Sequence, residues 1–429
     1  MMTHQHKRLL ILSSLGGALE YFDFIIYILL APLIEKIFFA NNEAYIATLK
    51  TLAIFSLGYL LRPLGGIIFS SLGDKYGRKR IFLLTITLMA IPSFAISLLP
   101  TPEQIGSLSP ILLLLFRMMQ GLALGGEIPA AITFVAEHTQ PSKRSFSLST
   151  LFLGINIGLL LGSLLLALLT SLLSPNEMLN VGWRIPFFMG GILGLIALFL
   201  RRHLHETKAF ATLTKQDIVR LPVLTVLKNA WRQVLLGMAL VSAGAVSVFI
   251  YLYWPHYLSD YMHYDYAQLI KMTTISTLIC SIVMLIGGYL ADRIGPQRFY
   301  LALTATLALF TYPLFLLFSS NNMVLVLVSY ALFSVLFGML PGAYCAILST
   351  LFPTPIRYSG IALSFNLAYA ILGGLSPLIC TYLIHRFDSI LAPAYYITLM
   401  AVISCVACYK TSDRSHAFTQ NNELGKESL

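Results

Sequence analysis

Apolar runs of about twenty residues recur along the whole chain, each long enough to cross the roughly 30 Å hydrocarbon core of a bilayer as a helix. Backbone polar groups in lipid must be paired within the protein, and a helix pairs its own. Of the 429 residues, 57% are hydrophobic and 11% are charged, whereas about 25% of a soluble domain is charged. The pattern therefore excludes one large soluble domain and predicts an all-α membrane protein.

The apolar runs predict twelve transmembrane helices, which lie near 9–34, 48–71, 81–99, 111–137, 146–173, 184–201, 232–258, 269–291, 299–319, 323–352, 358–384 and 393–409. A polar stretch divides them into six and six. We therefore expect an N-terminal six-helix bundle (1–201), a cytoplasmic linker (202–231), a C-terminal six-helix bundle (232–410) and a short cytoplasmic tail (411–429).

The distribution of lysine and arginine predicts the orientation. With a cytoplasmic N-terminus, the loops on that side and the C-terminal tail hold 21 of the 28 basic residues, and the opposite loops hold five. Cytoplasmic loops of membrane proteins carry such an excess. We expect a multi-pass protein of the plasma (inner) membrane with both termini in the cytoplasm. This placement explains the net charge of +10 by the lipid bilayer, without a nucleic-acid partner.

The two halves of the chain carry a repeated motif. LGDKYGRKR follows the second span and LADRIGPQR follows the eighth, so Asp74 aligns with Asp292 and Arg80 with Arg298 at one offset of 218 residues. Paired six-helix halves are typical of secondary transporters, whose binding site lies between the halves near the membrane midplane. A purely structural duplication is the alternative.

Several short segments resemble the major facilitator superfamily and, within it, the metabolite–proton symporter branch: GDKYGRKR, LEYFDF, RPLGG, RMMQGLALGGE, WRIPF and IRYSGIALSFN. The resemblance covers nearly the whole chain and implies the major facilitator fold of two six-helix bundles. It also implies alternating access, with symport of a small polar metabolite driven by the proton gradient and without a cofactor. Members of the branch carry proline and betaine, α-ketoglutarate, citrate, shikimate and dicarboxylates.

Charged residues inside the spans are candidates for proton coupling, because a charge facing lipid is costly. Glu20 and Asp23 share one face of the first span, since they are three residues apart. Arg62 in the second span, and Arg117 and Glu127 in the fourth, are their expected partners. We interpret these residues as a charge cluster in which one carboxylate carries the proton. A static ion-pair network that fixes helix packing is the alternative.

Substrate contacts are harder to assign from the residues. The planar fork of an arginine suits a substrate carboxylate, and the two arginines within spans favour a zwitterion or monocarboxylate. The resemblance implies that spans 1, 4, 7 and 10 line the cavity. The candidate lining residues are Tyr27, Gln120, Asn156, Tyr251, Tyr344 and Asn366. Aromatic residues of the seventh span fit either a cage for a quaternary ammonium group or an interfacial belt.

Charges at the cytoplasmic ends of the spans predict a gate. In the superfamily the aspartate of the signature loop contacts the other half, and its arginine pairs with an acid at the end of helix 4, which is Glu137 here. The gate residues implied by this resemblance are Asp74, Arg78, Arg80, Glu137, Asp292, Arg298 and Arg357. The alternative is that these basic loops only anchor the orientation.

Other function classes remain open at this point. The sequence contains no HExxH or Walker A motif, so we expect neither an enzyme nor a metal site. A transporter-like sensor without flux, and a uniporter or exchanger of the same fold, are the remaining alternatives. We expect a monomer whose partners are a small-molecule substrate and protons.

Overall fold

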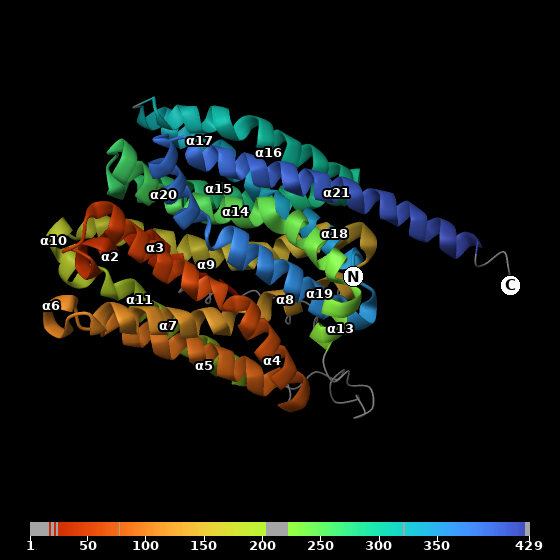
Figure 1. Ribbon diagram of the computed structural model, residues 1–429, viewed down its shortest axis with the longest axis horizontal. Helices are drawn as coiled ribbons and strands as arrows, with labels where there is room; N and C mark the ends of the chain where they lie inside the picture. The colour runs from red at the N-terminus through yellow and green to blue at the C-terminus, as the bar shows by residue number, and fades with distance from the viewer. Residues whose placement is uncertain are drawn as a thin grey trace.

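The computed structural model describes residues 17–18, 21–22, 25–76, 78–202, 222–320 and 322–424, and it leaves out the side chains at 70–82, 138, 200–202, 222, 224–225, 354–355 and 412–424. All regular structure in this described part is helical. The helices run roughly along the long axis of the molecule (Figure 1). Glu20 and Asp23 lie outside the described residues, so the structure does not test their place in the charge cluster.

The first half of the chain contains α2 (Ala31–Phe38), α3 (Ala44–Leu60), α4 (Arg62–Tyr76), α5 (Arg78–Ser97), α6 (Pro102–Ile105), α7 (Leu108–Leu124), α8 (Glu127–His138), α9 (Arg144–Leu172), α10 (Pro175–Glu177) and α11 (Arg184–Arg202). The second half contains α13 (Pro222–Asn229), α14 (Trp231–Met262), α15 (Tyr266–Ile294), α16 (Pro296–Phe318), α17 (Met323–Gly338), α18 (Leu340–Thr350), α19 (Thr354–Leu367), η3 (Ala368–Gly373), α20 (Ser376–Phe387) and α21 (Ala392–Leu424).

The number of spans agrees with a twelve-helix fold. In the described part, nine helices are long and apolar enough to cross a membrane, or ten if the bent pair at 175–199 counts as one span. The third expected span appears as a shorter apolar helix within α5, and the first is described only in part. The structure adds α13 inside the expected linker, and α21 continues past the boundary expected at residue 410.

Several spans are broken by proline. A proline has no N–H to donate to the carbonyl four residues earlier, so the helix is interrupted there. Pro63 follows the α3–α4 break, Pro129 the α7–α8 break and Pro341 the α17–α18 break. Interrupted helices free backbone groups inside a membrane protein, where they can take other partners.

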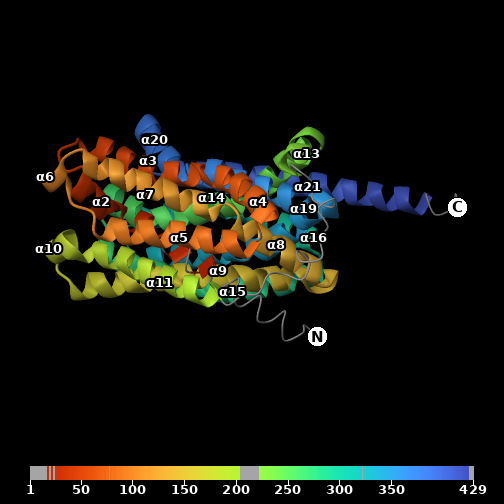
Figure 2. The same ribbon diagram turned by 90° about the horizontal axis from the view of Figure 1, so that it is seen from below.

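The two halves pack along each other over most of their length. Between the halves, α9 packs against α15, and α3 packs against η3 and α20. Figure 1 and Figure 2 show α13 and the first turns of α19 at one end of the molecule, with α2, α6 and α10 at the other. We call these the linker end and the far end.

Glycines allow the closest helix contacts within the first half. A Cβ on Gly121 would lie 1.7 Å from the carbonyl oxygen of Gly58, so α7 can approach α3 only because the side chain is absent. In α9, a Cβ on Gly158 would lie 1.8 Å from the carbonyl oxygen of Ala18. These contacts hold spans 1, 2, 4 and 5 together, and so position the charged residues that they carry.

Candidate functional site

Arg62 lies at the centre of the interface between the halves. It is the first residue of α4 and is fully buried. Its Nε donates a hydrogen bond of 2.9 Å to Oδ1 of Asn366 on α19, in the other half. Tyr21 lies beside the guanidinium group, but neither terminal nitrogen of Arg62 meets hydrogen-bond geometry with a described residue. These two nitrogens carry N–H groups in a planar fork, a geometry that suits an anionic group.

Asn366 joins the broken fourth span to the second half. Because Pro129 has no N–H, the carbonyl of Gly125 loses the helical partner it would have in an unbroken helix. Nδ2 of Asn366 donates to this carbonyl at 2.7 Å, while Oδ1 accepts from Arg62. One amide thus satisfies a buried carbonyl and a buried cation from the first half.

Aromatic rings from both halves surround Arg62. Its Cζ lies 5.8 Å from the ring centroid of Tyr59, 5.7 Å from that of Phe365 and 5.5 Å from that of Tyr369. Phe249 of α14 contacts the Tyr59 ring at 4.6 Å and the Tyr369 ring at 6.1 Å. We call Tyr59, Phe249, Phe365 and Tyr369 the central ring cluster. Its π faces can attract a second cation as they attract the guanidinium group.

Arg117 forms a second buried cationic centre, within the first half. Its guanidinium Cζ lies 4.7 Å from the ring centroid of Tyr27, and Nη1 donates to Oε1 of Gln120 at 2.8 Å. Gln120 in turn donates to Ser93 at 2.9 Å. Glu127, also buried, begins α8 just after the break. The expected partners of these charges in span 1, Glu20 and Asp23, lie outside the described residues.

The other expected lining residues divide into two groups. The Tyr344 ring lies 6.1 Å from that of Phe152 in the first half, and its hydroxyl is 3.1 Å from that of Tyr369. Asn156 of α9 donates to Ser281 of α15 at 2.8 Å, across the halves. Tyr251 is instead enclosed in the second half, with its hydroxyl 2.6 Å from Ser276 and its ring against Trp254, Tyr330 and Phe337. This placement favours a packing role for Tyr251 over substrate contact.

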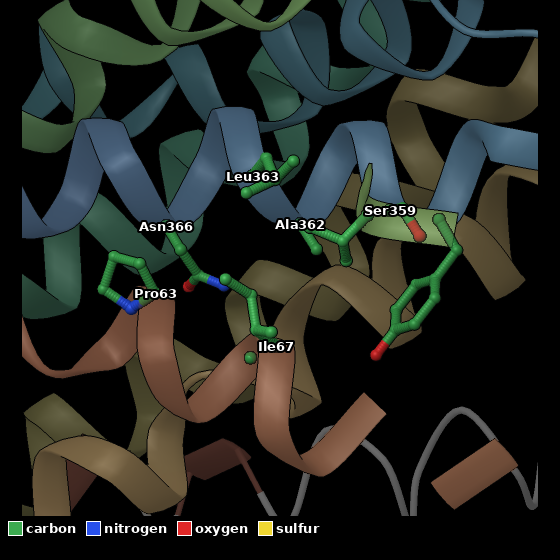
Figure 3. A pocket seen from close by; sticks show the side chains of 9 residues that line it. Pro63, Ile67, Ser359, Ala362, Leu363 and Asn366 are labelled. Atoms are coloured by element: carbon green, nitrogen blue, oxygen red, sulfur yellow. The ribbon is translucent and has the colours of Figure 1, made fainter. Parts of the chain in front are cut away.

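A narrow cleft opens beside the central site (Figure 3). It is small, with a volume of about 10 Å³, and lies between α4, α13 and α19. Asn366 points across it from α19 toward α4 (Figure 3), and Tyr358 and Ser359 line its wall toward the linker end. The cleft therefore lies between Tyr358 and Asn366, the partner of Arg62.

Contacts between the halves close the linker end. Nη1 of Arg357 lies 2.9 Å from Oε1 of Glu137. The carboxylate of Asp292 accepts from the backbone N–H groups of Ser145 and Phe146, both at 2.9 Å. Arg298 is exposed at the start of α16. The side chains of the other three expected gate residues, Asp74, Arg78 and Arg80, lie outside the described part, so the pairing of a signature-loop arginine with Glu137 is untested.

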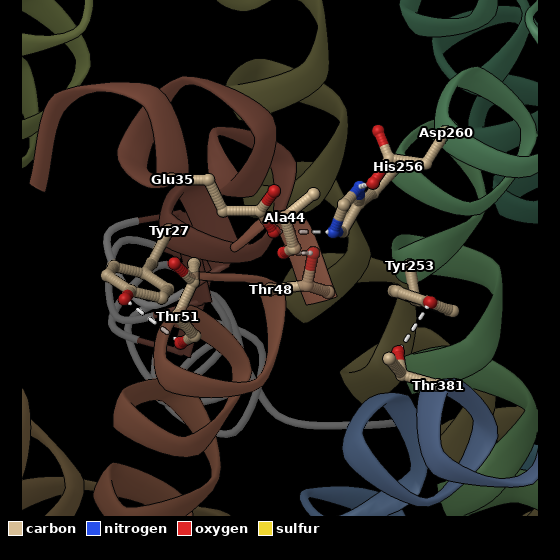
Figure 4. A network of polar contacts seen from close by, with 9 residues as sticks. All are labelled: Tyr27, Glu35, Ala44, Thr48, Thr51, Tyr253, His256, Asp260 and Thr381. Atoms are coloured by element: carbon tan, nitrogen blue, oxygen red, sulfur yellow. Dashed lines mark hydrogen bonds and ion pairs between the residues drawn. The ribbon is translucent and has the colours of Figure 1, made fainter. Parts of the chain in front are cut away.

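The far end carries an ion cluster that the sequence analysis missed. Nε2 of His256 on α14 lies 2.7 Å from Oε1 of Glu35 on α2, and its Nδ1 lies 3.4 Å from Oδ2 of Asp260 (Figure 4). Ligand atoms of these three residues lie within 4.8 Å of one another, the one such group among the described residues. Glu35 and His256 are 221 residues apart, and each reads as an ordinary residue at the end of a span. Glu35 directly precedes Lys36 in the sequence, and nothing in this pattern predicts a partner in the other half.

Comparisons with known proteins agree with this architecture. Residues 13–377 match the family model of the Major Facilitator Superfamily. The chain is 35% identical over 407 residues to the proline/betaine transporter of Escherichia coli (strain K12), covering 92% of this chain and 81% of the relative. It is also 35% identical over 406 residues to the glycine betaine/proline/ectoine/pipecolic acid transporter OusA of Dickeya dadantii (strain 3937), covering 91% and 80% of the two chains. Among solved structures, a D-xylose–proton symporter superposes with a TM-score of 0.76 at 17% identity, covering 94% of this chain and 97% of that one.

Proposed function

Because the chain belongs to the major facilitator superfamily, we propose that it is a proton-coupled symporter of a small zwitterionic osmolyte, such as proline or betaine. The observation that carries this proposal is the fully buried Arg62 among aromatic rings from both halves. The names of the relatives, which are transporters of proline and betaine, support the same substrate class. An organic acid such as α-ketoglutarate is a weaker candidate, since we find one buried arginine at the centre of the interface in the described part.

In this proposal the two ends of the substrate have separate partners. The carboxylate binds the terminal nitrogens of Arg62, whose fork suits two oxygens. The ammonium group lies against the central ring cluster, where cation–π attraction favours a desolvated cation. Because Arg62 contacts the same rings, one small molecule can bind the guanidinium group with its carboxylate and the rings with its ammonium group. Tyr344 and Asn156 lie close enough to the interface to contribute polar contacts.

We propose that proton coupling depends on the acids of the predicted charge cluster. Glu127 begins α8 beside the break in the fourth span and is buried. A buried carboxylate that alternately meets water on each side can take up and release a proton, which is how intramembrane acids serve proton relays. We propose Glu127, with Glu20 and Asp23, as the proton-carrying group. The proposal needs no cofactor, because the proton gradient drives transport.

Alternating access supplies the route through the membrane. We propose that the linker end is cytoplasmic, as the excess of basic residues indicates, with both termini on that side of the inner membrane. Breaking the Arg357–Glu137 pair and the Asp292 contacts would open this end, while the far end stays closed. We further propose that the monomer is the transporting unit.

Uptake by purified protein in proteoliposomes tests the proposal. Labelled proline or betaine should accumulate only when the outside is more acidic than the inside, and an added proton ionophore should abolish accumulation. Arg62→Gln should remove uptake, whereas Arg386→Gln, at an exposed arginine of α20, should retain it. Binding without flux would identify a sensor, and uptake that ignores the gradient would identify a uniporter or exchanger; either result would contradict the proposal.

A further inference from the structure

The far end of the interface is closed by a different kind of contact from the linker end. Glu35 belongs to the first half and His256 to the second, and their side chains meet at 2.7 Å (Figure 4). The His256 side chain is 1% exposed, although it lies near the end of its helix, and that of Glu35 is 12% exposed. Separation of the halves at this end must break this contact and bring both groups into water.

Each nitrogen of the His256 ring has a carboxylate oxygen nearby, at ion-pair distance and not in hydrogen-bond geometry. Glu35 approaches Nε2 and Asp260, which is 39% exposed, approaches Nδ1 at 3.4 Å. A protonated imidazole carries an N–H on each nitrogen, whereas the neutral ring carries one N–H and one lone pair. The neutral ring would therefore turn a lone pair toward one of the carboxylates. The arrangement fits a protonated ring held between two acids.

A metal ion is the alternative occupant of the same cluster. The two nitrogens of one imidazole point away from each other, so a single ion cannot bind both. One nitrogen of the ring and one oxygen from each carboxylate nevertheless lie within 4.8 Å of one another, so the test below includes a chelator to separate an ion from a proton. Metal sites in proteins gather three or four ligand atoms around one point.

Among the described residues, His256 carries the one imidazole that lies between Glu35 and Asp260. Lys36 of α2 and His263 at the end of α14 are the other basic groups in the surroundings of Asp260. Tyr253 of α14 packs edge-on against the His256 ring at 5.4 Å. On the neighbouring helices α3 and α20, Tyr45 and His385 contact each other at 3.7 Å, and the hydroxyl of Tyr266 donates to the carbonyl of Leu29. These last two contacts also join the halves at this end.

We propose that Glu35, His256 and Asp260 form a proton-dependent latch that holds the far end closed while His256 is protonated. Opening separates the ring from Glu35 and exposes it to solvent, where imidazole is largely neutral at or above about pH 7. Acidity on the far side therefore favours the closed state of this end. The inference rests on the proposed alternating access, but it does not depend on which solute is carried.

The latch is tested by the rate at which a buried cysteine becomes accessible. Thr48→Cys, on α3 at a site 5% exposed in the closed structure, serves as the reporter in purified protein whose five native cysteines are replaced by alanine. Its maleimide labelling rate is divided by that of the exposed Asn41→Cys, which removes the intrinsic pH dependence of the reaction. The normalised rate should fall as the pH is lowered from about 8 to 5.5, the range in which imidazole titrates.

Substitutions in the cluster separate the latch from general destabilisation. His256→Gln should raise the normalised rate at acid pH about fivefold or more, a typical size for coupling between two sites, and should flatten its pH dependence. Asp260→Asn, at a more exposed position, should reduce the slope of the normalised rate against pH. This variant provides the test if His256→Gln does not fold. His263→Asn removes an imidazole at the same end, where asparagine tolerates the positive φ of 58°, and should retain the slope.

Three results would overturn the proposal. The first is a pH slope in His256→Gln equal to that of the parent, or the same equality in Asp260→Asn if His256→Gln does not fold. The second is a folded parent protein with no pH slope at all. The third is a slope that disappears when EDTA is added, which would assign the closure to a bound metal ion. Because labelling is measured without substrate, a failed uptake experiment leaves this test unaffected.

Discussion

Asn366→Ala should loosen the linker end of the interface by a predictable amount. The substitution removes the 2.9 Å bond from Nε of Arg62 and the 2.7 Å bond to the carbonyl of Gly125. Both partners are buried in the closed state, so both are left unpaired there, whereas water can reach them once the halves separate. A hydrogen bond from a charged donor contributes about 1.5–3 kcal/mol and a neutral one about 1 kcal/mol.

Together these bonds favour the closed state by about 2.5–4 kcal/mol, which corresponds to a factor of roughly 70 to 1,000 in the open-to-closed ratio. Relaxation around the smaller side chain will return part of this free energy. We therefore expect at least about a tenfold increase in the population that is open at the linker end.

The assay is maleimide labelling of Ser359→Cys, at a cleft position that is 6% exposed, in purified protein in detergent. The rate should rise at least about tenfold in the Asn366→Ala background. Ser364→Ala, at another buried polar residue of α19 whose Oγ has no hydrogen-bond partner among the described residues, should leave it unchanged. A twofold change in rate corresponds to about 0.4 kcal/mol. If folded Asn366→Ala is labelled at a rate within about twofold of the parent, the claim that this amide holds the end closed is refuted.

Three further outcomes follow from the site and the packing. Arg62→Lys keeps the charge but loses the planar fork, and should weaken proline or betaine binding at least about tenfold in calorimetric titration; unchanged affinity would remove Arg62 from the carboxylate site. Glu127→Gln should abolish uptake driven by a pH gradient while counterflow exchange survives, and gradient-driven uptake at the parent rate would exclude Glu127 as the coupling acid. Gly121→Ala places a Cβ 1.7 Å from a backbone oxygen, whereas the nearest atom to a Cβ at Gly126 is 3.8 Å away. The melting temperature should therefore fall by several degrees in Gly121→Ala and hardly change in Gly126→Ala, and equal values for the two variants would contradict the packing argument.

The helical framework could be predicted from the sequence because lipid leaves so few choices. An apolar run that crosses a bilayer as a single segment must be a helix, and the lysine and arginine counts predict which loops share the cytoplasmic side. The repeated motif and the family resemblance then indicate two halves with a site between them. Arg62 was identified as a buried cation for the same reason, since no charge can face lipid without a large penalty.

The partners of these residues could not be predicted, because they come from distant parts of the chain. Arg62 and Asn366 are 304 residues apart, and nothing local marks one as the ligand of the other. The aromatic rings around Arg62 gave no signal either, since a phenylalanine such as Phe249 in an apolar span reads as packing. Tyr251 was proposed as a substrate contact on the same grounds, and its neighbours in the structure favour packing. The apolar pattern of the sequence predicts which residues are buried, whereas their contacts depend on the tertiary fold.

Asp292 gives one helix of the first half an N-terminal cap that belongs to the second half. Its two carboxylate oxygens accept from the amide groups of Ser145 and Phe146, in the first turn of α9. The start of a helix carries about half a positive charge from its aligned peptide dipoles. Each time the halves part at this end, that partial charge loses its counter-ion, and water or a dissolved anion must take the vacated place. The ionic composition of the solution at this end thus becomes part of the energetics of every transport cycle.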